Sequence, residues 1–248
     1  MTPQTIICMK WGTRYGPEFV NRLASMVRRS TRRPTRFVCF TDNVAGVEAE
    51  AHAIELHPLP PIKIPDRVAW TPWRKLSVWQ YPLAGLEGDV LFLDVDLVIT
   101  GGLDDFFDFE PGKYVAIDNW TQPGKRVGNT SAFRFPVGRY KHIFDDFVTN
   151  PEAILSKWRI EQQYISDSID EMLLWPKAWC VSFKHSLLPP WPLNFFKVAQ
   201  LTPDARIVAF TGKPDPDDAL IGAWPGRTLR QKLYKHVRPT PWIAEHWR

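Results

Sequence analysis

Residues 89–100 read Asp89-Val-Leu-Phe-Leu-Asp-Val-Asp-Leu-Val-Ile-Thr100 and carry the strongest structural signal in the chain. The apolar run predicts a buried strand, and its end carries two carboxylates, Asp94 and Asp96, one residue apart. Residues two apart on a strand point to the same side, so both carboxylates can face one cation. Without a cation or basic group between them they would repel each other. Because hard oxygen ligands suit Mg²⁺ or Mn²⁺ and leave positions for a diphosphate, we predict a metal site.

The beginning of the chain predicts a strand–helix–strand unit. Residues 6–9 are typical of a strand, residues 17–29 of an amphipathic helix with proline in its first turn, and residues 36–40 of a second strand. Such a unit normally belongs to a parallel sheet, which binds ligands at the carboxyl ends of its strands. The loops at those ends are residues 10–16, which include Tyr15, and residues 41–43, which include Asp42.

The rest of the chain continues the alternation of strands and helices. We expect further strands at 114–118, 131–135 and 206–210, and helices at 72–81, 140–148, 151–158, 161–174 and 226–238. The proline-rich residues 57–66 and the residues 175–200 are expected to be irregular. The expected fold class is therefore α/β, with a mostly parallel central sheet flanked by helices and a Rossmann-like nucleotide-binding half.

The composition is that of an ordinary globular protein. The chain has 248 residues, of which 44% are hydrophobic and 23% charged, so general disorder is excluded. No apolar run approaches the ~18 residues that a membrane span needs. The three cysteines, Cys8, Cys39 and Cys180, have no metal-type spacing, and their odd number argues against a disulfide framework. We expect free thiols and a cytoplasmic protein, with the inner face of the membrane as an alternative location.

The formal net charge of +4 conceals two basic ends around an acidic centre. Residues 1–41 sum to +7 and residues 226–248 to +5, which leaves −8 for the residues between them. Basic segments attract anionic partners. No nucleic-acid-binding motif accompanies the arginines, so we expect no nucleic acid as a partner. The apolar and basic residues of the tail make peripheral contact with a membrane an open alternative.

A longer block, residues 74–107, resembles glycogenin-like GT-A glycosyltransferases of the family 8 type. The similar residues are Arg74-Lys-Leu-Ser-Val-Trp79, Val90-Leu-Phe-Leu-Asp-Val-Asp96, Val98-Ile-Thr100 and Leu103-Asp-Asp-Phe-Phe107. Two later segments, Gly128-Asn-Thr-Ser-Ala-Phe133 and Glu161-Gln-Gln-Tyr-Ile-Ser166, also resemble that family. The resemblance implies one GT-A domain over residues 1–248, with a nucleotide-sugar-binding half at 1–120, an acceptor half at 121–225 and a basic tail at 226–248.

The resemblance also implies a function, the metal-dependent transfer of a sugar. The donor is expected to be a nucleotide-diphosphate sugar, most simply a UDP-sugar, and the acceptor a hydroxyl of a glycan or of a lipid-linked molecule. Glycogenin-like relatives retain the anomeric configuration, so retention is expected here. The Mn²⁺ or Mg²⁺ and a lysine stabilise the charge that develops on the departing diphosphate.

The family's functional residues can be placed on this chain position by position. The metal ligands are expected to be Asp94 and Asp96. The donor-binding residues are expected to be Tyr15 at the base, Asp42 in its loop, Lys75, Asn129, Ser131, Gly212 and Lys213. The catalytic pair is expected at Glu161 and Gln162. Structural alternatives exist for several of them: Lys75 can solvate a helix, Tyr15 can pack on Trp11, Asn129 can cap a turn, and Glu161 can stabilise a helix N-terminus.

The chain departs from the family near residue 210. The family ends its core with a strand and a histidine that is the third metal ligand, followed by glycine and Lys-Pro. Here the matching residues are Val208-Ala-Phe-Thr-Gly-Lys-Pro-Asp-Pro216, with Ala209 or Thr211 at the position of the histidine. A threonine hydroxyl can bind a hard ion weakly, or Asp217 or Asp218 can complete the shell. The third ligand therefore stays open.

Two other functions remain as alternatives. An apolar strand followed by Asp-x-Asp also marks haloacid-dehalogenase-type phosphatases, in which the first aspartate attacks phosphorus. That motif normally lies on the first strand, whereas about 90 residues precede it here. The second alternative is a GT-A-like protein that has lost its third metal ligand and binds a nucleotide or glycan without turnover.

Overall fold

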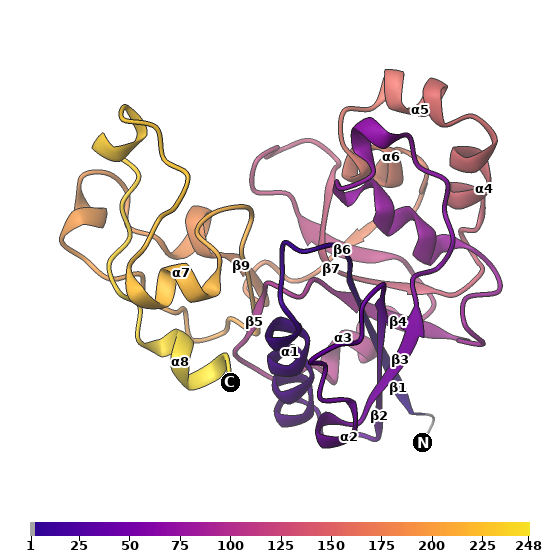
Figure 1. Ribbon diagram of the computed structural model, residues 1–248, viewed down its shortest axis with the longest axis horizontal. Coiled ribbons are helices and arrows are strands. Elements are labelled where there is room, and N and C mark those ends of the chain that lie inside the picture. Colours follow the sequence, from indigo (N-terminus) through magenta and orange to yellow (C-terminus); the bar gives the residue numbers. More distant parts are fainter. Residues whose placement is uncertain (1–2) are drawn as a thin grey trace.

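A computed structural model describes residues 3–248 and contains two sheets (Figure 1). The large sheet has seven strands in the order β3 (Ile54–Pro58), β2 (Thr35–Thr41), β1 (Gln4–Lys10), β4 (Asp89–Leu93), β7 (Gly128–Pro136), β6 (Val115–Asp118) and β8 (Leu173–Leu174). The pairs β3–β2, β2–β1, β1–β4 and β6–β8 are parallel, and β7 is antiparallel to both of its neighbours. The expected α/β class with a mostly parallel central sheet is confirmed.

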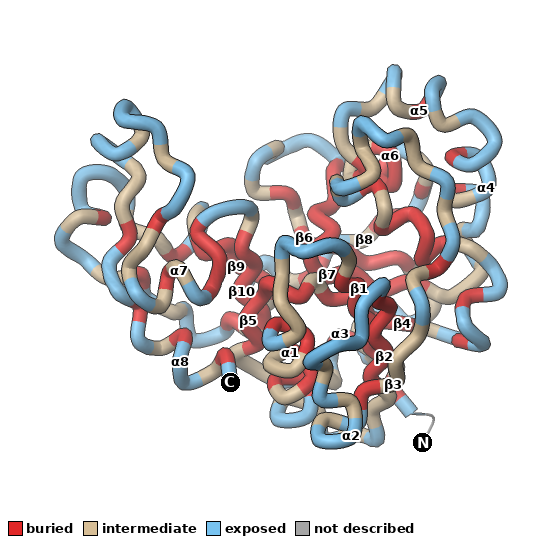
Figure 2. The backbone as a smooth tube through the Cα atoms, viewed as in Figure 1, coloured by how far each residue is buried: buried red, intermediate tan, exposed pale blue. Residues whose placement is uncertain are grey.

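The two faces of the large sheet are covered by different layers. On β4, Leu91 and Leu93 belong to one core, whereas Val90 and Phe92 belong to the other, because successive strand residues point to opposite faces. Helix α1 (Pro17–Ser30) covers the first face. The 3₁₀ helix η2 (Pro72–Trp79), α4 (His142–Thr149) and α6 (Glu161–Asp167) contribute to the second core. Both cores appear as the continuous buried centre of the molecule in Figure 2.

Helix α1 forms for reasons that are visible in its sequence. Pro17 occupies the first turn, where its missing N–H is not needed, and Glu18 lies near the positive end of the helix dipole. The residues buried on one side are Phe19, Val20, Leu23, Ala24, Met26 and Val27. The strand–helix–strand unit expected at the start of the chain is therefore confirmed, with β1 and β2 parallel on either side of this connection.

The small sheet lies beyond the carboxyl end of β4. Its strands are β5 (Val98–Ile99), β10 (Ile207–Ala209) and β9 (Cys180–Ser182), with β10 in the middle. Helices α7 (Pro216–Ile221) and α8 (Trp242–His246) lie beside it, at the left of Figure 1. The remaining elements are α2 (Ala49–His52), α3 (Asp105–Asp108), α5 (Pro151–Lys157), the 3₁₀ helices η1 (Asp66–Val68), η4 (Leu193–Phe195) and η5 (Gln231–Leu233), and the π-helix η3 (Phe183–Leu187).

Several expected elements differ in the structure. The helix expected at 161–174 ends at Asp167, and Leu173–Leu174 forms β8 because its backbone pairs with β6. The strand β3 lies partly in the proline-rich segment expected to be irregular, and residues 175–200 contain β9 and two short helices. Pairing with distant strands stabilises these short segments, which local periodicity does not reveal.

The prediction of a helix at 226–238 is wrong. Only residues 231–233 form a single 3₁₀ turn. Leu229 and Leu233 are 83% and 72% exposed, whereas Val237 is 1% exposed, so the three do not share one helix face. Within residues 3–248, no helix is long and apolar enough to cross a membrane.

Candidate functional site

The first carboxylate, Asp94, lies where β4 ends at the centre of the large sheet. Its backbone N–H donates to the carbonyl oxygen of Ser131 on β7 at 2.8 Å. Its side chain pairs with Lys75 of η2, whose Nζ lies 2.6 Å from Oδ1 and 2.7 Å from Oδ2. Lys75 is 5% exposed and also donates to the carbonyl oxygen of Thr130. The lysine therefore neutralises and orients Asp94, and it does more than solvate its helix.

The second carboxylate, Asp96, is buried and accepts a hydrogen bond from a tyrosine. The Tyr15 hydroxyl donates to its Oδ2 at 2.6 Å. Burial and the negative charge of Asp94 raise the pKa of Asp96 to about 7, and the charge of Asp215 acts in the same direction. The hydrogen bond from Tyr15 and the charge of Lys75 oppose this shift. Asp96 therefore holds a proton more readily than an exposed aspartate does.

A third carboxylate, Asp215, lies near Asp96 at the start of α7. It is 3% exposed, and its Oδ2 pairs with Lys213 Nζ at 2.7 Å. Its side chain and that of Asp218 form a reciprocal capping box at the first turn of α7. Within residues 3–248, its Oδ1 has no hydrogen-bond partner. Arg14 Nη2 lies 3.6 Å from this oxygen, which is too far for a hydrogen bond. Lys213, expected at the phosphates, contacts Asp218 at 2.8 Å as well.

The expected catalytic pair, Glu161 and Gln162, opens α6 beside β7. Glu161 is 3% exposed, and its Oε1 accepts a hydrogen bond from the Thr130 hydroxyl at 3.0 Å. Burial raises the pKa of Glu161, although the charge of Lys75 opposes this. Gln162 Oε1 accepts from Asn119 Nδ2 at 2.8 Å. Asn119 follows β6 and lines a cavity of about 350 Å³, so Gln162 contacts a residue of the cavity wall, whereas Glu161 is enclosed.

The loops after β1 and β2 meet at the same edge of the sheet. Asp42 Oδ2 accepts a hydrogen bond from the backbone N–H of Gly12 at 2.9 Å and thereby joins the two loops. The ring of Tyr15 packs on Phe19 with a centroid distance of 4.9 Å, whereas Trp11 packs against the other core. The ring of Tyr15 and the loops that carry it are therefore held close to Asp96.

Asn129 and Ser131 lie on β7 beside the end of β4. They are 4% and 7% exposed, and Asn129 Oδ1 accepts from the backbone N–H of Ser131 at 2.9 Å. The carbonyl of Ser131 receives the N–H of Asp94. Both residues therefore support the backbone next to the first carboxylate.

Residues of different chemistry fill the position of the family's histidine. Ala209 is fully buried on β10, and its methyl group cannot bind a metal. Thr211 follows, and its Oγ1 is buried with no hydrogen-bond partner among the described residues 3–248. The side chains of Asp94, Asp96, Asp215 and Thr211 would offer a cation oxygen donors only. Such a set fits a hard divalent cation.

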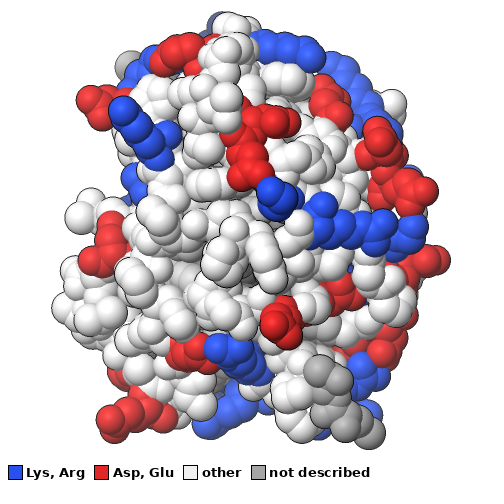
Figure 3. Space-filling model, turned by 90° about the vertical axis from the view of Figure 1, so that its right-hand side faces the viewer, with Lys and Arg blue, Asp and Glu red and all other residues white. Residues whose placement is uncertain are grey.

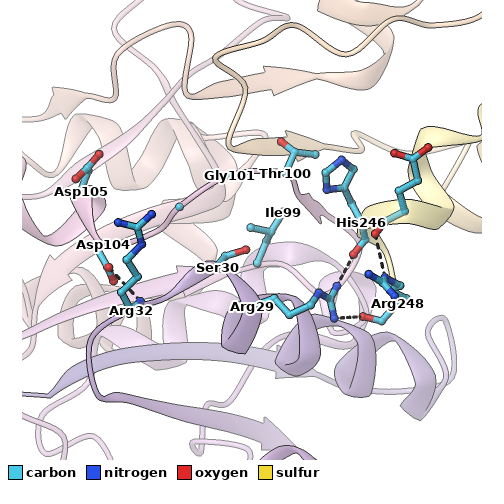
Figure 4. A pocket seen from close by; sticks show the side chains of 12 residues that line it. Arg29, Ser30, Arg32, Ile99, Thr100, Gly101, Asp104, Asp105, His246 and Arg248 are labelled. Atoms are coloured by element: carbon cyan, nitrogen blue, oxygen red, sulfur yellow. Dashed lines mark hydrogen bonds between the residues drawn. The ribbon is translucent and has the colours of Figure 1, made fainter.

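A larger cavity lies elsewhere, between α1, the loop after β5, and α8 (Figure 4). Its volume is about 570 Å³. Arg29 points across it and donates to the carbonyl oxygens of His246 and Arg248, both at 2.6 Å. Three arginines and three acidic residues line this cavity, so it offers no net charge to a diphosphate. The paired carboxylates remain the candidate site.

Sequence reasoning missed three residues that the fold brings to the site: Arg14, Asn119 and Asp215. Arg14 lies over the Tyr15 ring at 4.9 Å from its centroid and next to Asp215. The pattern Asp215-Pro-Asp-Asp218 is typical of a helix start, which predicts a capping role. A helix-start pattern does not predict that Asp215 lies near Asp96, because only the fold brings the start of α7 close to the end of β4.

The architecture is that of known glycosyltransferases. No protein-family model matches the chain, and no curated protein is similar to it in sequence. The galactosyltransferase LgtC, solved in complex with donor and acceptor sugar analogs, has a TM-score of 0.61 and 13% identity, covering 86% of this chain and 89% of LgtC. The glycosyltransferase GlyE of Streptococcus pneumoniae TIGR4 has a TM-score of 0.59 and 14% identity, covering 86% of this chain and 56% of GlyE.

A third structure belongs to a mammalian enzyme. Mouse xyloside xylosyltransferase 1 in its apo form has a TM-score of 0.55 and 10% identity, covering 86% of this chain and 98% of that one. The chain therefore has the GT-A fold of these glycosyltransferases, as the resemblance of residues 74–107 implied. Membership of family 8 itself stays a prediction.

Proposed function

We propose that this protein is a metal-dependent glycosyltransferase that moves a sugar from a nucleotide-diphosphate donor, most simply a UDP-sugar, to a hydroxyl acceptor. The observation that carries the proposal is the pair Asp94 and Asp96 at the end of the central strand of a GT-A fold. Carboxyl ends of parallel strands are where such sheets bind nucleotides. The loops that hold Tyr15 and Asp42 lie at the same edge.

The chain's own residues divide the work of this reaction. Asp94 and Asp96 would hold the Mn²⁺ or Mg²⁺, which when bound supplies positive charge to the departing diphosphate. Lys75 holds the Asp94 carboxylate in place, and the Tyr15 hydroxyl orients Asp96. Lys213, next to Gly212, would be the cation that stabilises phosphate oxygens, and in the structure its ammonium pairs with Asp215 and Asp218. We propose retention of the anomeric configuration.

The acceptor is proposed to enter the cavity of about 350 Å³ next to Gln162. Trp120 and Trp175 are among its lining residues, as are Asp118 and Asn119. Aromatic faces combined with a carboxylate and an amide suit a sugar ring with several hydroxyls. The hydrogen bond between Gln162 and Asn119 connects the expected catalytic pair to this cavity. Glu161, the other member of the pair, is buried and accepts a hydrogen bond from Thr130. We therefore propose a glycan acceptor.

The deciding experiment combines ligand binding with turnover. UDP, GDP and their sugars, each with and without Mn²⁺, are tested for a rise in melting temperature, since a ligand of the folded state stabilises it by mass action. Asp96→Ala should abolish the metal-dependent rise and the release of nucleotide from a sugar donor. Phosphatase activity on small phosphate esters that Asp94→Asn abolishes would favour the dehalogenase-type alternative. Tight nucleotide binding without transfer to any acceptor would favour the binding module.

We further propose that the protein meets anionic membranes through a basic lobe, defined as residues 188–197 and 226–236. Hydrogen bonds from Trp191 and Asn194 to backbone carbonyls of 233–236 hold its two segments together. The lobe has five Lys/Arg and no acidic residue. Its exposed apolar side chains are Trp191, Leu193, Phe196, Leu229, Leu233 and Tyr234. By contrast, positive and negative side chains intermingle on the face in Figure 3. Exposed aromatics among basic residues suit the interface of an anionic bilayer.

Vesicle sedimentation tests the lobe. The protein should sediment with vesicles that contain an anionic phospholipid and stay in solution with purely zwitterionic vesicles. Leu229→Ser together with Leu233→Ser should weaken this binding, whereas Val44→Ser, at an exposed apolar residue outside the lobe, should not. If both variants bind anionic vesicles equally well, the basic lobe is not the membrane-binding surface.

A further inference from the structure

The carboxylate of Asp215 is buried and only half used. Its side chain is 4% exposed. One oxygen, Oδ2, pairs with Lys213, and Oδ1 is buried without a hydrogen-bond partner among the described residues. A buried carboxylate oxygen without a hydrogen bond is costly, and the Arg14 guanidinium at 3.6 Å offsets only part of that cost. This oxygen is therefore available to a ligand.

A short chain of contacts connects Asp215 to the paired carboxylates. Arg14 Nη2 lies 3.6 Å from Asp215 Oδ1, and its guanidinium lies over the ring of Tyr15 at 4.9 Å from the centroid. The hydroxyl of Tyr15 contacts Asp96 at 2.6 Å. Asp215 and Asp96 also repel each other electrostatically. Asp215 and Asp96 are therefore near neighbours, with Arg14 and Tyr15 between them.

The other candidates for a third ligand are less suitable. Ala209 has no donor atom, and Asp217 is exposed. Asp218 Oδ2 receives both the backbone N–H of Asp215 and the ammonium of Lys213. The acidic side chains of 215, 217 and 218 lie close together, yet Asp215 alone of the three is buried.

We propose that Asp215, through Oδ1, supplies the third protein ligand to the divalent cation held by Asp94 and Asp96, in the place where relatives use a histidine. This inference deepens the proposed function and rests on it. The donor set then consists only of oxygens, with the Thr211 hydroxyl as a further neutral donor. Oxygen-only sites suit Mg²⁺, whereas an imidazole ligand favours transition metals such as Mn²⁺. The site should therefore prefer Mg²⁺ more than a histidine-containing one does.

Binding of the metal alone tests the proposal without any assay of activity. Free Mn²⁺ is measured by electron paramagnetic resonance while the protein is titrated, and Mg²⁺ is added as a competitor. Asp215→Asn keeps an acceptor for the first turn of α7 but removes the charged ligand. It should weaken Mn²⁺ binding about tenfold or more. The matched control Asp217→Asn, on the same helix, should change it less than about twofold.

A second variant protects the result against a folding artefact. Thr211→His on the Asp215→Asn background should restore Mn²⁺ affinity and weaken competition by Mg²⁺, because it returns a nitrogen ligand. Melting curves without metal show that each variant is folded. Unchanged Mn²⁺ affinity in Asp215→Asn, or a larger loss in Asp217→Asn, would overturn the proposal.

The proposal and the proposed function can fail separately. If Asp96→Asn abolishes metal binding and Asp215→Asn does not, the function stands and the role of Asp215 falls. If both variants lose the metal and no sugar is transferred from any nucleotide donor, Asp215 is a ligand of a site with another function.

Discussion

Asp96 and Tyr15 illustrate what happens at the scale of single residues. The sequence places a carboxylate after a buried strand, yet its hydrogen-bond partner lies 81 residues away in the chain. The same holds for Lys75, whose ammonium is enclosed between Asp94 and the carbonyl of Thr130. The resemblance of residues 74–107 predicts that Lys75, Asp94 and Asp96 belong to this site. The hydrogen-bond partners of these side chains depend on the tertiary fold, and the burial that the fold imposes raises the pKa of Asp96.

The raised pKa of Asp96 predicts a pH-dependent stability. Its folded-state pKa of about 7 lies above the usual 3.8, so between these values the folded chain binds a proton that the unfolded chain has lost. Stability from this group is therefore lost as the pH rises through that window. Asp96→Asn cannot ionise and still accepts from Tyr15. In chelator-treated protein, the free energy of unfolding of this variant should rise relative to that of the wild type, by a few kcal/mol at most, as the pH increases from about 4 to about 7.

Urea titrations across this pH range provide the measurement. Asp217→Asn, at an exposed aspartate, is the control for the loss of one carboxylate. Parallel stability curves for Asp96→Asn and the wild type would show that Asp96 ionises without penalty.

At the scale of elements, the segment after residue 225 shows the limits of periodicity. Leu229, Leu233 and Val237 are spaced as on one helix face, and the basic residues between them complete an amphipathic pattern. The structure contains one 3₁₀ turn instead, held by backbone and side-chain contacts to the segment that carries Trp191 and Asn194. A marginal helix of this length has little stability of its own, so contacts with a neighbouring segment determine its conformation.

The burial of this segment predicts unequal effects of mutation. Leu229→Ser and Leu233→Ser should each change the free energy of unfolding by less than about 0.5 kcal/mol, because both side chains are largely exposed. Val237→Ala should lower it by at least about 1 kcal/mol, since Val237 is 1% exposed. Urea denaturation followed by circular dichroism measures all three. Similar losses at the three positions would indicate the amphipathic helix after all.

For the whole molecule, the last residues join the first helix. Trp247 of the segment after α8 is 4% exposed and meets the ring of Phe19 edge-on at a centroid distance of 5.2 Å. The guanidinium of Arg22 lies 4.0 Å from the centre of its ring. Both Trp247 and Phe19 belong to the core that runs from α1 to the small sheet. The segment around α8 is therefore part of the same packed unit as α1 and the first strands of the large sheet.

This packing predicts a loss of global stability from a substitution far from the site. Trp247→Ala should lower the free energy of unfolding by about 3 kcal/mol or more, and unfolding should stay a single transition. Phe196→Ala, at a 76% exposed aromatic residue, should have an effect of less than about 0.5 kcal/mol. Fluorescence and circular dichroism during urea unfolding report on both variants. Equal stability of the two would mean that the α8 segment contributes nothing to the core.

Local sequence patterns predicted the α/β class, the first strand–helix–strand unit and the position of the paired carboxylates. These features depend on neighbouring residues, because strand and helix periods repeat over a few positions. Three features depend on the fold: the hydrogen bond from Tyr15 to Asp96, the burial of Asp215 close to Asp96, and the contact of residues 226–236 with 188–197. Contacts between distant segments depend on how whole layers of the fold pack together. A pattern of neighbouring residues contains no information about which distant segment will pack against them.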